Sequence, residues 1–413
     1  MRSSRNGASD LSSRMSSGSG PPSDHNREFF FLHMSLTRER IQLYYLATDC
    51  AMDRYQLSLP GPTEYDPEVL AKLECPVLPH YGDLWLATYW EILDLLKQVF
   101  RTKNRVYVIP GSGSSGLDAV FTSLGPKRGL ILNNGTFGTR LSAIASRHLS
   151  ECTVLEKQPG EPFEQEEVEN ALSSQDYQLL AVVHGETSTG MLNQLENLAA
   201  ACRKRSILFI VDAISSLGGV PLDVDRLGID FCVSASQKAL GAPPGLALIS
   251  ASEKGFDAMP PEDKIHGWYL NLRTWAWYEK EWRDWHPYPV TLPVNLFQAL
   301  KKAMELLLRE GIANVWERHR SISEELWSSL QHLGIQPFIT KENHRLPTVT
   351  AALLPGKYRS EDLQEFLQTN FGILIAGGVG PLRKRIIRIG HMGYSAKSWF
   401  VNRVVAATAQ FLQ

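Results

Sequence analysis

The chain alternates short continuous runs of apolar residues with longer segments in which apolar residues recur every three to four positions. Short apolar runs rich in β-branched residues are typical of strands buried in a parallel sheet, whereas the longer amphipathic segments are typical of helices. From about residue 106 onward, this alternation predicts an α/β fold with one large, mainly parallel sheet. We expect seven strands, at residues 106–109, 130–133, 152–155, 179–184, 207–212, 229–234 and 246–250, with helices such as 137–148 and 193–204 between most of them.

The pattern changes in the last part of the chain. Residues 263–290 hold five tryptophans among charged residues and prolines, without a regular period. Such a segment either packs internally or forms a subunit interface or the wall of a site. Beyond it the periodicity predicts helices over 296–310 and 312–333, strands near 346–353 and 385–389, and a last helix from about 396. We therefore expect a large domain over 51–310 and a smaller α+β domain over 311–413.

The first 50 residues differ from the rest of the chain. Residues 1–28 are rich in Ser, Gly, Arg, Asn and Pro, a composition that cannot offset the entropy lost on ordering. We expect them to be disordered within an N-terminal tail and arm over 1–50. Arg and Ser are frequent in transit peptides, but Asp10, Asp24 and Glu28 are atypical of one. The segment is either a targeting sequence or an extension upstream of a start near Met34, and we expect a cytoplasmic protein.

Composition narrows the class of protein. With 43% hydrophobic and 21% charged residues in 413, the chain is typical of a globular protein with a large core. A net charge of -2 gives no basic surface for nucleic acid, and the apolar runs are shorter than the ~20 residues of a membrane helix. The five cysteines are scattered without metal-binding spacing, so we expect free thiols and no metal site.

A glycine-rich motif follows the first predicted strand. Residues 111–116 read Gly-Ser-Gly-Ser-Ser-Gly and open a helix, which formally satisfies the G-x-G-x-x-G dinucleotide pattern. A dinucleotide site also needs a carboxylate at the end of the second strand, where this chain has Asn133 and Asn134. The pattern therefore argues against an NAD-dependent dehydrogenase. It favours a helix N-terminus that binds one phosphate, or else a turn that packs a helix onto the sheet.

Two further residues carry candidate chemistry. Asp212 ends a buried strand, and the carboxyl end of a parallel strand faces the ligand crevice of an α/β sheet. Lys238 follows in a turn of small residues between two apolar strands. A partly desolvated lysine has a lowered pKa and becomes a nucleophile that forms imines. Together with the phosphate-binding turn, these two residues meet the needs of pyridoxal phosphate: an acid for the pyridine nitrogen, an amine for the aldehyde and an anion site.

At this point the chain resembles the class V, fold-type I pyridoxal-phosphate aminotransferases of the alanine-glyoxylate and serine-pyruvate group. The resemblance runs from about 56 to 413. The motifs that carry it are Leu-Pro-Gly-Pro-Thr at 59–63, Gly-Ser-Gly at 111–113, His-Gly-Glu-Thr-Ser-Thr-Gly at 184–190, Val-Asp-Ala-Ile-Ser-Ser-Leu-Gly-Gly at 211–219, Ser-Gln-Lys-Ala-Leu at 236–240, Ala-Pro-Pro-Gly at 242–245 and Arg-Ile-Gly at 388–390.

The resemblance implies a role for each matching residue. It implies that Lys238 forms the Schiff base, that Asp212 binds the pyridine nitrogen and that Thr187 lies near the ring hydroxyl, where the family often has serine. The phosphate would be held by a set of small and polar residues: Ser112, Gly113, Ser114 and Gln237, with Tyr288 and Thr291 contributed by the neighbouring subunit of a homodimer. Phe137 stands where relatives have a tryptophan stacked on the ring, and Ser114 where they often have histidine, so the substrate can differ.

Arg388 also has an interpretation from the residues alone. It alternates with Ile387 and Ile389 on a predicted strand, and a guanidinium so placed binds a carboxylate bidentately or forms a salt bridge. With the resemblance, this predicts transfer of an amino group from a small α-amino acid to a 2-oxo acid such as glyoxylate or pyruvate. The alternatives are a relative acting on pyridoxamine or ureidoglycine, a pyridoxal-phosphate lyase, and a non-catalytic relative.

Overall fold

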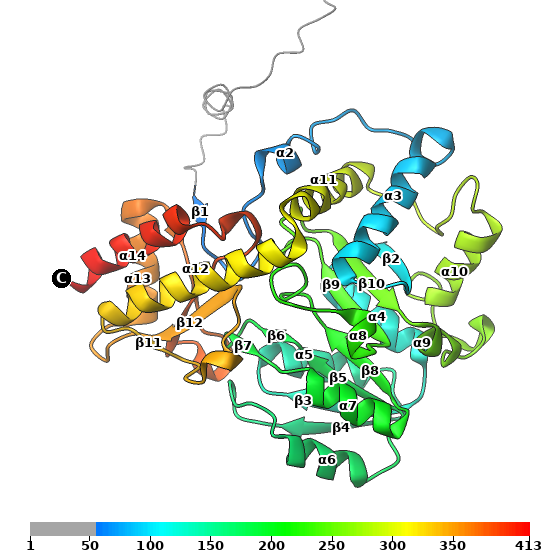
Figure 1. Cartoon of the computed structure of the whole chain (residues 1–413), viewed down its shortest axis with the longest axis horizontal. Coiled ribbons are helices and arrows are strands. Elements are labelled where there is room, and N and C mark those ends of the chain that lie inside the picture. The colour runs from blue at the N-terminus through cyan, green and yellow to red at the C-terminus, as the bar shows by residue number, and fades with distance from the viewer. Residues whose placement is uncertain (1–54) are drawn as a thin grey trace, which may run out of the picture. The chain divides into compact units, whose positions relative to one another are not determined.

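The structure, a computed structural model, describes residues 55–413, so the tail and arm predicted over 1–50 lie outside the described residues. Its centre is the predicted seven-stranded sheet (Figure 1), in the order β2-β10-β9-β8-β5-β3-β4. Every neighbouring pair is parallel except the two pairs that β10 makes, which are antiparallel. The strands are β2 (Arg105–Pro110), β3 (Arg128–Asn133), β4 (Glu151–Glu156), β5 (Leu179–Val183), β8 (Leu208–Asp212), β9 (Phe231–Ala235) and β10 (Leu246–Ala251).

Helices cover the sheet because its inner strands are apolar on both faces. Every residue of β5, β8, β9 and β10 is buried, which explains why these strands read as continuous hydrophobic runs. Helix α4 (Gly113–Leu124) packs on β9 and β10, α5 (Thr136–Ala145) on β3 and β5, and α7 (Glu196–Arg205) on β8. The other helices of this part are α2 (Pro67–Leu70), α3 (Asp83–Phe100), α6 (Gln165–Ser173), α8 (Val224–Leu227), α9 (Glu253–Asp257), α10 (Leu272–Glu281) and α11 (Val294–Glu310).

The C-terminal part contains a second, smaller sheet. Its order is β11-β12-β15-β14, with strands β11 (Gln336–Pro337), β12 (Val349–Leu353), β14 (Ala376–Gly377) and β15 (Ile386–Gly390). The helices α12 (Ile312–His332), α13 (Ser360–Phe371) and α14 (Ser398–Leu412) accompany it (Figure 1). A separate hydrophobic cluster, from Ile322 to Ala407, forms the core here. These elements match the predicted smaller α+β domain, and the exact boundary at 310 stays a prediction.

Short elements connect these parts. Strand β1 (Gln56–Leu57) pairs in parallel with β13 (Ile373–Leu374), so the start of the described chain joins the C-terminal part. Strands β6 (Gly185–Glu186) and β7 (Met191–Leu192) form a small hairpin directly after β5. The 3-10 turns are η1 (Glu262–Lys264), η2 (Glu342–His344), η3 (Gly380–Leu382) and η4 (Gly393–Ser395).

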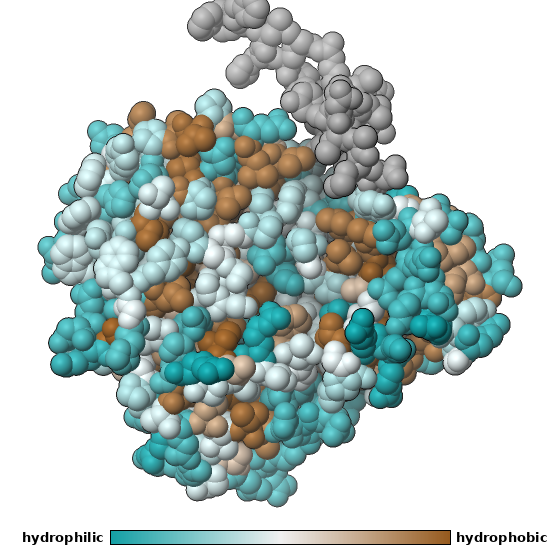
Figure 2. All heavy atoms as spheres, turned by 180° about the vertical axis from the view of Figure 1, so that it is seen from behind, coloured by the Kyte–Doolittle hydropathy of each residue, from teal (hydrophilic) through white to brown (hydrophobic). Residues whose placement is uncertain are grey.

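The tryptophan-rich segment divides between core and surface. Trp275 of α10 is buried, whereas four tryptophans are 39 to 53% exposed: Trp268, Trp277, Trp282 and Trp285. Val77 and Leu84 are also largely exposed. In the view of Figure 2, hydrophobic side chains gather in several patches between hydrophilic ones. Among residues 55–413, no helix combines the length and the apolar character needed to cross a membrane.

Candidate active site

A cavity of about 310 Å³ lies at the carboxyl ends of the large sheet's parallel strands. It gathers residues that follow β2, β3, β5, β8 and β9, and therefore brings together segments that are distant in sequence. The lining residues are Ser112, Gly113, Ser114, Leu117, Phe137, Arg140, Val183, Gly185, Asp212, Ile214, Ser215, Gln237 and Lys238. Most residues singled out from the sequence thus share one cavity.

The glycine-rich motif forms the N-terminus of α4 at one wall of this cavity. Ser112 is the N-cap residue, and its side chain makes no capping hydrogen bond. The N–H groups in the first turn of a helix have no acceptor within the helix, and the helix dipole favours an anion there. A Cβ atom on Gly113 would lie 2.5 Å from the side chain of Ile214, so any other residue would require that side chain to move. This end of the cavity is suited to a phosphate.

Asp212 and Lys238 form the charged centre of the cavity. Asp212 is 4% exposed, and its Oδ1 accepts a hydrogen bond of 2.9 Å from the backbone N–H of Ile214. Burial raises the pKa of Asp212 to about 7, although that hydrogen bond opposes the rise. Burial also lowers the pKa of Lys238 to about 8, although the charge of Asp212 opposes the fall. Burial therefore opposes the charge of both groups, and the charge of each partly offsets this effect for the other.

The Lys238 side chain is held from outside its own turn. Its Nζ donates a hydrogen bond to the carbonyl oxygen of Pro60. A Cβ atom on Gly61 would lie 2.5 Å from Nζ and 2.7 Å from Cδ of Lys238. The backbone can approach the lysine this closely because Gly61 has no side chain. Gly61 also has a φ of 109°, which favours glycine. The motif at 59–63 thus contributes directly to the site.

Arg388 lies beside the cavity and not in its lining. Its Nε donates to the carbonyl oxygen of Gly377 at 2.7 Å and its Nη1 to that of Thr187 at 3.1 Å. It is 8% exposed and forms no salt bridge with a described carboxylate. The salt-bridge interpretation is therefore wrong for the described chain. Two carbonyl oxygens orient the guanidinium, whose pKa is lowered by burial while the negative charge of Glu186 opposes that effect.

Two buried polar atoms near the cavity lack a partner. The hydroxyl oxygen of Thr187 and the amide oxygen of Gln237 are buried and make no hydrogen bond with the described residues. Buried polar atoms are normally satisfied, so an unpartnered pair at a cavity indicates groups that bind a ligand. The phosphate-binding turn, the buried acid, the lysine and the Thr187 hydroxyl together fit pyridoxal phosphate.

Tyr288 and Thr291 do not line the cavity of their own chain. The Tyr288 hydroxyl donates to the carbonyl oxygen of His80, and its ring contacts those of Tyr89 and His286. Thr291 is exposed. Tyr288 is fully buried within its own chain, and a contribution of either residue across a subunit interface stays a prediction.

Sequence reasoning missed Glu186 and Arg140 as individual site residues. Glu186 is fully buried, and its carboxylate accepts hydrogen bonds from Phe137, Gly138 and Ser188. The guanidinium of Arg140 lies 4.9 Å from the centre of the Phe137 ring and lines the cavity. A carboxylate within a glycine- and hydroxyl-rich motif was a usable signal for Glu186. For Arg140 the usable signal was its position one helical turn after Phe137, which places both side chains on the same face of the helix.

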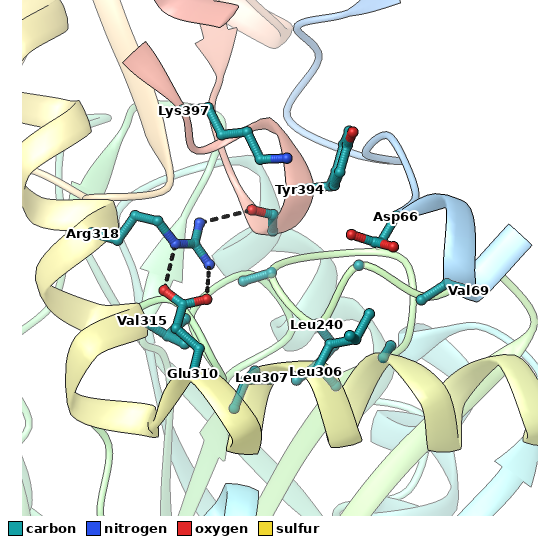
Figure 3. A pocket seen from close by; sticks show the side chains of 14 residues that line it. Asp66, Val69, Leu240, Leu306, Leu307, Glu310, Val315, Arg318, Tyr394 and Lys397 are labelled. Atoms are coloured by element: carbon teal, nitrogen blue, oxygen red, sulfur yellow. Dashed lines mark hydrogen bonds and ion pairs between the residues drawn. The ribbon is translucent and has the colours of Figure 1, made fainter. Parts of the chain in front are cut away.

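A second cavity of about 340 Å³ lies between α11, α12 and the turn that follows Lys238 (Figure 3). Its floor includes Leu240, Leu307 and Val315. Arg318 borders it and is bound by both carboxylate oxygens of Glu310, at 2.7 and 3.0 Å. None of the predicted site residues lines this second cavity, so we assign the candidate active site to the cavity that contains Asp212 and Lys238.

The fold and the first cavity define a fold-type I pyridoxal-phosphate enzyme. Residues 79–384 match the sequence model of the family described as aminotransferase class V. The chain is 35% identical over 362 residues to alanine–glyoxylate aminotransferase of Mus musculus, covering 86% of each chain. It is 32% identical to (S)-ureidoglycine–glyoxylate transaminase of Bacillus subtilis, covering 84% of this chain and 88% of that protein.

The crystal structure of alanine–glyoxylate aminotransferase from Nostoc sp. is similar to this structure with a TM-score of 0.84 and 32% identity, covering 89% of this chain and 97% of that one. The chain belongs to the class-V aminotransferase family. It is a pyridoxal-phosphate-dependent transaminase, as the sequence predicted.

Proposed function

We propose that this transaminase moves an amino group from a small α-amino acid to a 2-oxo acid such as glyoxylate or pyruvate. The observation that carries the proposal is that Asp212 and Lys238 share one cavity with a phosphate-binding helix N-terminus, with Arg388 beside it. The names of the similar proteins, two of which use glyoxylate, support this choice of acceptor.

Different residues of this chain would bind different parts of the cofactor. Ser112, Gly113 and Ser114 would bind the phosphate together with Gln237, whose side-chain NH₂ group can donate to a phosphate oxygen. Thr187 would hydrogen bond to the ring hydroxyl, and Phe137 would stack on the ring. When bound, pyridoxal phosphate supplies an aldehyde that accepts the amino group and a pyridine ring that withdraws electrons.

Lys238 and Asp212 have different tasks in the reaction: Lys238 would transfer protons at the substrate, and Asp212 would keep the pyridine nitrogen protonated. Lys238 would hold the aldehyde at rest and, once released by the incoming amine, remove the proton from the substrate Cα. Its lowered pKa leaves a useful fraction of neutral amine near pH 8. Asp212 would keep a proton on the pyridine nitrogen, because a buried carboxylate beside that nitrogen stabilises its charge. Arg388 would bind the substrate carboxylate by two parallel hydrogen bonds.

We propose further that the active form is a homodimer with shared sites. The support is that Tyr288 and Thr291 do not line their own cavity and that the exposed ring of Trp285 contacts His286, which in turn contacts Tyr288. Aromatic residues are enriched at interfaces. An interface related by a two-fold axis would give two equal sites.

The function is tested by supplying pyridoxal phosphate, glyoxylate and a panel of amino acids, and measuring glycine and the new 2-oxo acid by mass spectrometry. We expect alanine to yield pyruvate and glycine in equal amounts, and Lys238→Ala to yield neither. The same panel includes (S)-ureidoglycine, which one relative uses, and pyridoxamine, which lacks a carboxylate. Amino transfer from none of these donors would refute the proposal, and a preference for pyridoxamine would replace its substrate class.

A further inference from the structure

Helix α5 carries Phe137 in its first turn, yet its N-terminus has no local cap. The N-cap position is Gly135, which has no side chain to accept a hydrogen bond. A helix N-terminus that lacks a cap leaves several N–H groups unsatisfied, and burial makes this costly. Because Phe137 would stack on the cofactor ring, whatever binds these N–H groups also determines where that ring lies.

The hairpin of β6 and β7 supplies the missing acceptors from 49 residues further along the chain. Glu186 Oε2 accepts hydrogen bonds from the N–H groups of Phe137 at 2.9 Å and Gly138 at 3.0 Å. Ser188 Oγ accepts a third from the N–H of Thr136 at 3.0 Å. The first three N–H groups of α5 are thus all bound by one glutamate and one serine.

The glutamate and serine are bound to each other as well. Glu186 Oε1 accepts hydrogen bonds from the backbone N–H of Ser188, at 3.0 Å, and from its hydroxyl. Glu186 is fully buried, so its carboxylate depends on these four donors and on the dipole of α5 for stabilisation. A Cβ atom on Gly135 would lie 2.5 Å from the glutamate side chain, so glycine is required where the carboxylate approaches the helix.

The same turn reaches the substrate-binding arginine. Thr187 stands between Glu186 and Ser188, and its carbonyl oxygen accepts the hydrogen bond from Arg388. Its unpartnered hydroxyl is the proposed contact for the cofactor. One buried carboxylate therefore lies at the junction between the ring-stacking helix, the cofactor-contacting threonine and Arg388.

We propose that Glu186 is a positioning residue for the cofactor: its carboxylate fixes the first turn of α5, and so the Phe137 ring, relative to Thr187. It does not touch the substrate and acts through Phe137. The inference rests on the proposed function, because it takes Phe137 to be the residue that contacts the cofactor ring.

Glu186→Gln is the informative change because it keeps the side chain's shape. The amide has one accepting oxygen, and its NH₂ group must face either the N–H groups of Phe137 and Gly138 or that of Ser188. Either orientation places donors against donors. We expect the affinity for pyridoxal phosphate, measured by absorbance titration of the apoprotein, to fall about tenfold.

A double-mutant cycle with Phe137→Ala separates positioning from general support of the fold. If Glu186 acts through the Phe137 ring, the glutamine change should weaken cofactor affinity about tenfold with the ring present and less than about twofold without it. Equal effects in both backgrounds would overturn the inference and leave the proposed function intact. Failure of the unaltered protein to bind pyridoxal phosphate would instead refute the proposed function.

Asp230→Asn provides a matched control. Asp230 is also a buried carboxylate, 4% exposed, that accepts hydrogen bonds from the N–H of Phe209 and the hydroxyl of Ser252 and pairs with Lys254 at 3.2 Å. It directly precedes β9 and therefore lies at the amino end of that strand, whereas the cavity lies at the carboxyl ends. We expect it to lower the thermal midpoint without changing cofactor affinity. A similar loss of affinity in this control would show that any buried carboxylate has this effect, and would overturn the inference.

Ser188→Ala keeps the inference testable if Glu186→Gln does not fold. It removes only the hydroxyl, which bonds to Glu186 and to the N–H of Thr136. We expect about a threefold loss of cofactor affinity that disappears in the Phe137→Ala background. An unchanged affinity, or a loss that persists without the ring, would overturn the proposal.

Discussion

The Nζ atom of Lys238 donates a hydrogen bond to the carbonyl oxygen of Pro60, across 178 positions of sequence. The contact is possible because Gly61, the next residue, presents no side chain to the lysine. The N-terminal part of the described chain therefore orients the nucleophile that the turn after β9 supplies. Anything that displaces this backbone should impair capture of the cofactor.

Gly61→Ala tests this relationship. The new Cβ would lie 2.5 Å from Nζ, and alanine is strained at a φ of 109°, so the lysine or the backbone must move. We expect the rate of covalent cofactor uptake, followed by absorbance, to fall about tenfold or more. Gly356→Ala is the control, since a Cβ there meets nothing within 4 Å, and it should react at the original rate. Equal rates for the two variants would show that the Pro60 contact is incidental.

The pH dependence of cofactor uptake reports the charge state of Lys238. Only the neutral amine attacks an aldehyde, and burial lowers the lysine pKa to about 8, so uptake by the apoprotein should rise with pH and level off above that value. The positive charge of Arg140 lowers this pKa further, whereas the negative charge of Asp212 raises it. Arg140→Gln should therefore move the midpoint of the rate profile to higher pH, and Asp212→Asn should move it to lower pH. Stopped-flow absorbance measures both shifts, and shifts in the same direction would contradict the assignment.

Arg388→Lys should separate charge from geometry at the substrate carboxylate. Lysine keeps the positive charge, but it cannot bind a carboxylate with two parallel hydrogen bonds or contact the carbonyl oxygens of Gly377 and Thr187 as arginine does. We expect kcat/KM for alanine to fall about ten- to a hundredfold, mainly through KM. Cofactor affinity should stay the same. Unchanged kcat/KM for every amino acid tested would remove Arg388 from the substrate site.

Mixed dimers test whether sites are shared between subunits. One chain carries Lys238→Ala, and the other carries Tyr288→Phe and Thr291→Ala. If Tyr288 and Thr291 complete the neighbouring site, each mixed dimer regains one site in which every group is original, and activity should exceed that of either parent. Purification through two different affinity tags isolates the mixed form. Activity no higher than the better parent would count against a shared site.

The sheet and much of the cavity could be predicted from the sequence because their signals are local. Buried parallel strands read as continuous apolar runs. Asp212 is the last residue of one such strand, and Lys238 lies three residues beyond the end of the next. The contacts that orient them could not be predicted. Glu186 hydrogen bonds to α5 across 49 positions of sequence, and Lys238 hydrogen bonds to Pro60 across 178. A local sequence pattern does not show such distant contacts. The orientation of Arg388 likewise depends on which carbonyl oxygens lie beside it, one of which the second sheet supplies.

The central claim, that Lys238 holds the cofactor of this transaminase, is tested most directly by borohydride reduction followed by peptide mapping. The holoprotein is reduced, digested and analysed by mass spectrometry, with Lys238→Arg treated in parallel. We predict that the pyridoxyl label is found on the peptide containing Lys238 and is absent from the variant. A label on any other lysine, or equal labelling of the variant, would contradict the account.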